Sequence, residues 1–367
     1  MDIIYLDCAA TTRPCKEAVE AFNSAPWLNP SATLYDSSAK LAIETARKTV
    51  ASELGCSTDQ IFFTSGSTEA ANWVINSTVH AGDHIITDLL EHPCVYESAL
   101  HAESRGVNVH FVKNEGCLLD LGSLDGLLKY CTARGRKVLV AIMSANNELG
   151  SEFRPSLIAE IVDYYENASY FCDMTQLQQP LDGVDFACMS AHKFGGYKGT
   201  GVCFARRPEE LVPLLYGGHQ EVNHRAGTEN VGGICAMAAA MKAREPLGYE
   251  LREHIEWLAA QSGMTVNGGD YVVPNIVSIT LPDCKAQDMV VALAMDGIYI
   301  SAGSACNTGT AEPSRVLLNA GLTADEALRT VRISFDRNNT EAEIDELFDR
   351  IKIIGKFWGN RMRTPSE

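Results

Sequence analysis

The 367-residue sequence lacks the features that mark several protein classes. It contains no C-x-x-C pair despite its 12 cysteines, and no apolar run approaches the roughly 18 residues that a membrane-spanning helix needs. Basic residues are scarce, since 30 Lys and Arg stand against 47 Asp and Glu, for a net charge of −17. These absences exclude a zinc ribbon, a thioredoxin-type motif and a membrane protein, and the acidic balance argues against direct binding of nucleic acid.

The amino terminus also lacks a secretion signal, because the segment from Met1 to Tyr5 has no basic region and no long apolar stretch follows. We therefore expect reduced thiols and a cytoplasmic protein. The content of 46% hydrophobic and 21% charged residues is ordinary for a globular protein. At this length, about two domains are expected.

Between residues 61 and 205, short β-branched and aromatic runs alternate with longer helical patterns. The predicted strands are Ile61–Thr64, His84–Thr87, Val107–Val112, Val138–Met143, Ser169–Asp173, Val184–Ser190 and Gly201–Ala205. This alternation predicts an α/β sheet of mostly parallel strands with helices on both faces. Only ten Gly-rich residues separate Ser190 from Gly201, too few for a parallel crossover, so the last strand should run antiparallel in a mixed, seven-stranded sheet.

Beyond residue 248 the pattern changes to a helix followed by fewer strands. Helices are predicted at Tyr249–Gln261 and Thr340–Lys356, with strands at Val272–Thr280, Ile298–Ser301 and Val331–Ser334 between them. We predict a large α/β domain at residues 15–248, and a small α+β domain made of residues 1–14 and 249–367.

Polar side chains follow the predicted strands where a ligand of an open α/β sheet binds, beyond the carboxyl ends. They are Ser67, Thr68, His92, Asn147, Asp173, Gln176, Ser190, His192 and Lys193. Each alone has an ordinary explanation, as a helix cap, a core histidine or a solvated lysine. Together, a phosphate-holding helix start, a stacking imidazole, a carboxylate and a lysine are what pyridoxal phosphate (PLP) requires.

With these motifs in this order, the chain resembles the cysteine desulfurases, class-V aminotransferase-like enzymes. The most specific pieces are Thr64–Glu69, Asn146–Gly150, Ser190–Lys193, Arg225–Asn230 and Ser301–Cys306. The resemblance implies the PLP-dependent transferase fold type I, with pyridoxal 5'-phosphate held as a Schiff base by Lys193.

The resemblance also implies a role for each matched residue. Asp173 corresponds to the partner of the pyridine nitrogen, and His92 to the imidazole that stacks on the ring and takes part in proton transfer. The other cofactor-binding positions are Ser67, Thr68, Gln176, Ser190, His192, Asn147 and Thr228. In the family, the residue matching Thr228 comes from the other subunit, which implies a homodimer, and Arg332 and Asn147 match the residues that hold the substrate carboxylate.

The implied activity is conversion of L-cysteine to L-alanine, with the sulfur held as a persulfide on Cys306. A sulfur-acceptor protein would then receive it, for iron–sulfur cluster assembly or tRNA thiolation. Cys306 lies among small residues suited to a mobile nucleophile loop of the small domain, whereas the other cysteines are interpreted as packing residues. Of these, only Cys94 lies near a predicted site residue.

Three alternatives remain open from the sequence. A selenocysteine lyase or cysteine-sulfinate desulfinase would share the cofactor site but depend less on Cys306. An aminotransferase of the same fold would form a keto acid instead of alanine. A non-catalytic sulfur-carrier or assembly protein would keep the fold without turnover.

Overall fold

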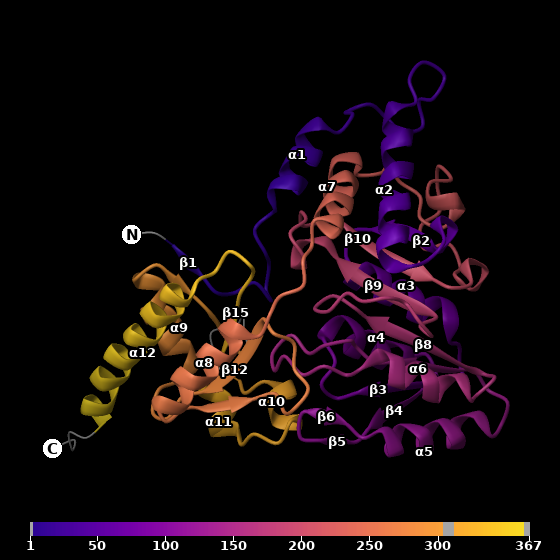
Figure 1. The fold of residues 1–367 in the computed structure, drawn as a ribbon. Helices are drawn as coiled ribbons and strands as arrows, with labels where there is room; N and C mark the ends of the chain where they lie inside the picture. Colours follow the sequence, from indigo (N-terminus) through magenta and orange to yellow (C-terminus); the bar gives the residue numbers. More distant parts are fainter. Residues whose placement is uncertain (1–2, 304–311, 363–367) are drawn as a thin grey trace.

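The computed structural model describes residues 3–303 and 312–362, and its main feature is a seven-stranded sheet (Figure 1). In spatial order the strands are β2 (Ile61–Thr64), β10 (Gly201–Ala205), β9 (Phe186–Ser190), β8 (Ala168–Asp173), β7 (Val138–Ala141), β3 (His84–Asp88) and β4 (Asn108–Val112). Only β10 runs antiparallel to its neighbours. The predicted mixed sheet is confirmed, including the antiparallel strand after the short Gly-rich connection.

Helices cover both faces of this sheet. One face packs against α2 (Ser38–Leu54), α5 (Leu121–Thr132), α6 (Pro155–Asp163) and α7 (Val231–Lys242), and the other against α3 (Ser67–Thr78) and α4 (Pro93–Ser104). Strand side chains alternate between the two cores, so that Tyr170 and Cys172 enter the first while Phe171 enters the second. Helix α1 (Lys16–Ser24) lies beside α7 (Figure 1).

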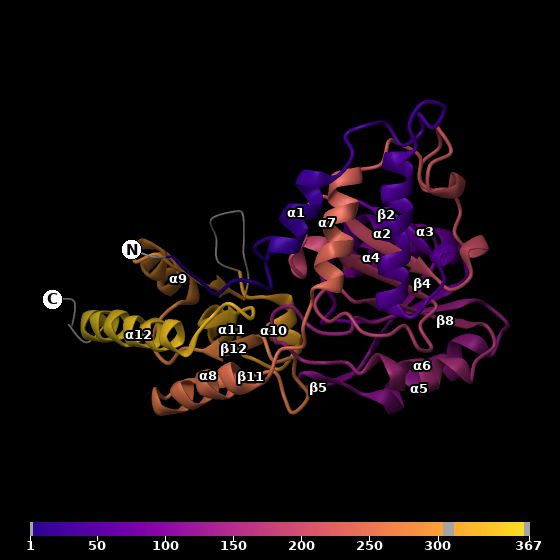
Figure 2. The same cartoon turned by 45° about the horizontal axis from the view of Figure 1, so that its top comes forward.

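A smaller antiparallel sheet lies beside the large one. Its order is β11 (Thr265–Asn267), β12 (Ile276–Thr280), β15 (Thr330–Ser334) and β14 (Ser301–Ala302). Helices α8 (Glu250–Gln261), α9 (Ala286–Met295) and α12 (Glu341–Met362) gather around it (Figure 2). The chain also forms two short helices, α10 (Arg315–Asn319) and α11 (Ala324–Leu328). A small hairpin pairs β5 (Asn114–Glu115) with β6 (Leu118–Leu119).

The start of the chain packs with this smaller sheet. Strand β1 (Ile4–Tyr5) pairs in parallel with β13 (Ile298–Tyr299), and Leu6 is fully buried in the same core. The predicted strand 298–301 is divided, because Tyr299 pairs with β1 whereas Ser301 pairs with β15. This packing supports the domain bounds predicted above, which stay a prediction. Within residues 3–303 and 312–362, no helix is long and apolar enough to cross a bilayer.

Candidate active site

The carboxylate of Asp173 is held at the end of β8, on the sheet face covered by α3 and α4. The backbone N–H of Thr175 donates to Oδ1 at 2.9 Å, and the Cys94 thiol donates to Oδ2 at 3.4 Å. Asp173 is only 5% exposed. A buried carboxylate with such partners has a fixed direction and can serve as a counter-charge for a cationic ligand group.

Lys193 follows the neighbouring strand, β9, in a single 3₁₀ turn (Ala191–Lys193). Its Nζ donates to the carbonyl oxygens of Ala9 at 2.6 Å and Ala10 at 2.8 Å. Gln176 Nε2 donates to the Ala9 carbonyl as well, at 3.0 Å. Burial, helped by the charge of Arg332, lowers the pKa of Lys193 to about 8. The amine is therefore closer to its neutral, nucleophilic form than a surface lysine would be.

His92 caps the amino end of α4, directly before Pro93. Its Nδ1 accepts a hydrogen bond from the Cys94 N–H at 3.2 Å, which places the proton of the neutral ring on Nε2. Burial lowers the pKa of His92, partly opposed by the charge of Asp173. The ring is therefore a neutral imidazole with its N–H on Nε2.

Ser67 and Ser190 form a small hydroxyl cradle at the start of α3. The Ser67 N–H donates to Ser190 Oγ at 2.8 Å, and the two hydroxyl oxygens lie 2.8 Å apart. A Cβ on Gly201 would lie 2.5 Å from the Gly66 Cα, so glycine is what lets β10 approach this turn. Thr68 is exposed at the next helical position. Helix N–H groups and hydroxyls in this arrangement suit a phosphate group.

His192 connects the turn of Lys193 to the amino-terminal segment. Its ring Nδ1 lies 3.1 Å from Thr11 Oγ1, and its carbonyl accepts from the Thr12 N–H at 2.7 Å. Burial, with nearby lysine charges, lowers its pKa to about 4, so the ring is neutral. Its predicted phosphate contact stays a prediction.

Arg332 on β15 makes hydrogen bonds through two of its three guanidinium nitrogens. Its terminal nitrogens donate to the Asn147 carbonyl at 2.7 Å and to Asp7 Oδ1 at 2.6 Å. Its Nε is buried and has no hydrogen-bond partner among the described residues. An unsatisfied buried donor on a guanidinium indicates a place for an anionic ligand group. Asn147 meets Arg332 through its backbone, and its side chain stays available.

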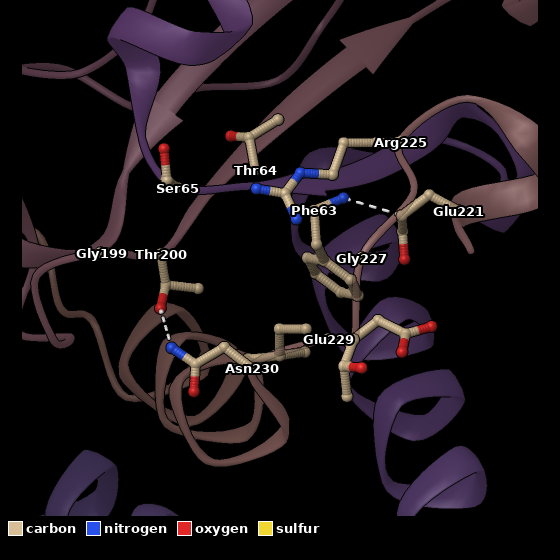
Figure 3. A pocket seen from close by; sticks show the side chains of 12 residues that line it. Phe63, Thr64, Ser65, Gly199, Thr200, Glu221, Arg225, Gly227, Glu229 and Asn230 are labelled. Carbon is tan, nitrogen blue, oxygen red and sulfur yellow. Dashed lines mark hydrogen bonds between the residues drawn. The ribbon is translucent and has the colours of Figure 1, made fainter. Parts of the chain in front are cut away.

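Two cavities open near these residues. The larger, of about 890 Å³, is lined by Lys193, Gln176 and several arginines, among them Arg13 and Arg337. The smaller, of about 210 Å³, is lined by Thr64, Ser65 and Arg225 (Figure 3). The exposed Thr228 lines it as well. Arg225 in this smaller cavity pairs with Glu69 at 2.9 Å. Of the predicted cofactor positions, Lys193 and Gln176 line the larger cavity and Thr228 the smaller one.

Sequence reasoning missed Arg315, and gave Glu148 no role although it lies in a quoted motif. Ser314 Oγ donates to the half-buried Glu148 at 2.7 Å, and loss of solvent around that carboxyl raises its pKa to about 7. Arg315 donates to the Glu91 carbonyl at 2.6 Å and lies over the Tyr96 ring. Their sequence neighbourhood gave no sign of this burial.

Two cysteines need separate comment. Cys94, interpreted as a packing residue, is buried but also donates its thiol to Asp173. Its position two residues after His92 was the available signal. Cys306 lies outside the described residues, so its predicted role stays a prediction.

The residues present fit PLP. The cradle of Ser67 and Ser190 suits its phosphate, Asp173 its pyridine nitrogen, and the partly deprotonated Lys193 its aldehyde. Within residues 3–303 and 312–362, Arg332 Nε has no hydrogen-bond partner, and such a donor suits the carboxylate of a ligand.

A family model described as aminotransferase class-V matches residues 4–347. The chain belongs to the aminotransferase class-V family. Among curated relatives of this class-V protein, the cysteine desulfurase IscS of Methanosarcina thermophila is 34% identical and covers 99% of this chain and 95% of its own length. The desulfurase IscS of Dictyoglomus turgidum is 33% identical, covering 96% and 94%.

Solved structures agree with the class-V assignment. A NifS-like protein from Rickettsia africae has a TM-score of 0.85 and 29% identity, covering 97% of this chain and 100% of its own. A structure titled SspA in complex with cysteine has a TM-score of 0.79 and 28% identity, covering 90% and 98%. The predicted α/β fold of PLP type I is confirmed.

Proposed function

We propose that this class-V protein is a PLP-dependent cysteine desulfurase, with Lys193 as the Schiff-base lysine. The observation that carries the proposal is the meeting of a reactive amine and a buried carboxylate, Lys193 and Asp173, at the ends of neighbouring strands. Full-length relatives of the same family carry the name cysteine desulfurase. The fit of the cofactor to these residues supports the assignment.

The cofactor, when bound, supplies an electron sink for bonds at the substrate Cα. The chain's own residues bind and orient it: Ser67, Ser190 and Thr68 at the phosphate, and Gln176 at the ring oxygen. His192 and Thr228 complete the phosphate site in this proposal. Asp173 keeps the ring nitrogen protonated, because it is a buried, anchored carboxylate.

Arg332 and Asn147 orient L-cysteine through its carboxylate. Asp7 holds the guanidinium in place, so its Nε–H, which has no partner among the described residues, keeps a fixed orientation. His92 covers the cofactor ring and exchanges a proton through Nε2. The backbone N–H of Cys94 donates to Nδ1, so the exchangeable proton of the ring is on Nε2. These contacts place the substrate sulfur for attack. The proposed mechanism uses no metal ion.

Cys306 takes the sulfur. Its thiolate bonds to the substrate sulfur while the Cβ–S bond of the substrate breaks, and the carbon skeleton gains a proton in place of sulfur. The balanced outcome is L-cysteine plus the Cys306 thiol giving L-alanine plus a Cys306 persulfide. We further propose a cytoplasmic homodimer that passes the sulfur to an acceptor protein of iron–sulfur cluster assembly or tRNA thiolation.

The test compares alanine and sulfide release from L-cysteine plus reductant by PLP-loaded wild type and Cys306→Ala. Cys235→Ala is the matched control, because Cys235 is a half-buried cysteine of α7 outside the site. We expect wild type and control to release both products and Cys306→Ala to release neither.

Other outcomes identify the alternatives. Equal alanine release from selenocysteine or cysteine sulfinate with and without Cys306 would favour a lyase or desulfinase. A keto acid in place of alanine would favour an aminotransferase. Bound cofactor without turnover of any of these substrates would contradict catalysis and favour a sulfur-carrier protein.

A further inference from the structure

A second group of metal-ligating side chains lies far from the cofactor residues. Among the described residues, two groups combine histidine with cysteine or acid at ligand distance. His92, Cys94 and Asp173 form one, and it belongs to the cofactor site described above. The other consists of His84, His110 and Cys131, and none of these residues takes part in the proposed catalysis.

The sheet register places these three side chains on one face. In the parallel pairing of β3 and β4, His84 is opposite Asn108 and Ile86 is opposite His110. Paired residues of parallel strands share a face, as do residues two apart, so both histidines point the same way as Ile86. Ile86 and Cys131 belong to the same core cluster, under α5.

The ligand atoms converge on one point. His84 Nδ1 and His110 Nε2 lie 2.9 Å apart, and these atoms and Cys131 Sγ all lie within 4.8 Å of one another. Zinc binds nitrogen at about 2.0 Å and sulfur at about 2.3 Å, so tetrahedral ligands lie roughly 3.3 to 3.6 Å from each other. Rotations of the two imidazole rings and of the Cys131 side chain that move the ligand atoms by about an ångström would complete the geometry.

We propose that His84, His110 and Cys131 form a binding site for one zinc ion, with water as the fourth ligand. Two imidazoles and a thiolate favour zinc over magnesium or calcium, which prefer oxygen. The half-buried histidines leave room for a solvent ligand, whereas Cys131 is only 1% exposed. On binding, the Cys131 thiol releases its proton to solvent. The proton shared between the two rings moves to the other nitrogen of the ring that carries it, so both histidines stay neutral and no oxidation occurs.

The site would fasten a helix to the edge of the large sheet. Cys131 lies near the end of α5, and His110 lies on β4, the edge strand. His84 begins β3 while His92 follows the end of that strand, so the metal and the cofactor would lie at opposite ends of the sheet. The expected role is therefore stabilisation, with no step in catalysis.

The test uses Co²⁺, whose visible spectrum reports tetrahedral geometry and a thiolate ligand. Metal-free, PLP-loaded protein carrying Cys306→Ala is titrated, so that the loop thiol does not bind the probe and the cofactor occupies the other group. We expect one Co²⁺ per chain, with tetrahedral bands in the red region and a thiolate charge-transfer band. His84→Ala, His110→Ala and Cys131→Ala should each lose the spectrum.

Matched controls and a second readout keep the result clear. His101→Ala, an exposed histidine of α4, and Cys235→Ala should retain the Co²⁺ spectrum. Added Zn²⁺ should raise the melting temperature of the parent and of both controls, and leave that of the three ligand variants unchanged. Each ligand variant must first show a cooperative melting transition without metal, and His84→Gln and His110→Gln replace any that does not.

The proposal is overturned if stoichiometric Co²⁺ gives no tetrahedral spectrum. It is equally overturned if the spectrum persists in the His84 and His110 variants, because the metal would then be bound elsewhere. Neither outcome bears on the desulfurase proposal, which is tested by its products.

Discussion

At the residue scale, the proposed role of Lys193 as the Schiff-base lysine makes cofactor capture depend on the protonation state of its amine. Burial first, and then Arg332, lowers the pKa of this amine to about 8. Only the neutral amine attacks an aldehyde. The rate of PLP capture by cofactor-free protein should therefore rise about tenfold per pH unit below pH 8 and level off above it.

Stopped-flow absorbance of the forming imine measures this profile. Arg332→Gln should move the plateau to higher pH, because it removes a positive charge that favours the neutral amine. A rate that climbs steeply to pH 10 in the wild type, as an ordinary lysine with a pKa of about 10.4 would give, would refute the lowered pKa.

The second residue-scale prediction concerns the hydroxyl cradle. Ser190→Ala removes the acceptor of the Ser67 N–H and one hydroxyl of the proposed phosphate site. A hydrogen bond to a charged group contributes about 1.5 to 3 kcal/mol, so the dissociation constant for PLP should rise at least tenfold. The imine with Lys193 should still form at high PLP concentration.

Absorbance titration gives that dissociation constant. Ser104→Ala, an exposed serine at the end of α4, is the control and should bind as the wild type does. Unchanged affinity in Ser190→Ala would remove Ser190 from the phosphate site.

Residue identities at the strand ends could be predicted from the sequence, but their partners could not. Lys193, Asp173 and His92 follow strands that periodicity identifies. The contact of Arg332 with Asp7 joins residues 325 positions apart, and it depends on how β15 and the chain start pack. No local pattern encodes such a contact.

At the element scale, the turn after β7 carries Asn147 and positions it through its neighbours. The buried Asn146 side chain accepts from the N–H groups of Glu148 and Leu149, and donates to the Leu90 carbonyl at 2.8 Å. Gly150 closes the turn with a φ of 74°. The turn is therefore held to the segment between β3 and α4, close to His92.

Gly150→Ala should destabilise the protein strongly. Its Cβ would lie within 2.3 Å of the Ile276 carbonyl oxygen, in addition to the cost of a positive φ. We expect a loss of at least about 2 kcal/mol of stability, read from the urea midpoint.

The matched control is Gly126→Ala in α5, where a Cβ meets nothing within 4 Å. This change should raise stability by about 0.5 to 1 kcal/mol, because alanine favours a helix. A Gly150→Ala protein as stable as the wild type would mean that the turn does not need its observed backbone shape.

Elements with strong periodicity were the predictable ones. The strands of the large sheet appear within a few residues of the expected bounds, since each is a β-branched or aromatic run, mostly buried except in the edge strand β4. The very short β13 and β14 were predicted as one strand, because a change of pairing partner at Ile300 leaves no trace in hydrophobic pattern. Their pairing is decided by distant segments.

At the scale of the whole molecule, the proposed homodimer, in which Thr228 reaches the partner's phosphate site, makes a prediction about mixed subunits. Thr228 lies exposed in the smaller cavity. If it completes the partner's phosphate site, a dimer of one Lys193→Ala chain and one Thr228→Ala chain contains one intact site. Such heterodimers, isolated through two affinity tags, should have about half the wild-type activity.

The control dimer pairs a wild-type chain with a chain that carries both substitutions. Its single lysine then faces an altered Thr228 from the partner, so it should be much less active than the mixed dimer. The reverse order of activities would show that Thr228 serves its own subunit.

The fold type and the family followed from the sequence at this scale, because the motifs extend in order over nearly the whole chain. The identity of the protein that accepts the sulfur could not be predicted from the sequence. A net charge of −17 restricts partners to those that tolerate an acidic surface, but charge alone names no partner.

The central claim is that sulfur passes from L-cysteine to Cys306. The most direct measurement is mass spectrometry of the peptide that contains Cys306, after PLP-loaded protein has reacted with L-cysteine without reductant. The account predicts the mass of one extra sulfur atom on Cys306, formed in step with alanine and absent in Lys193→Ala. Alanine formation with no added sulfur on that peptide would contradict it.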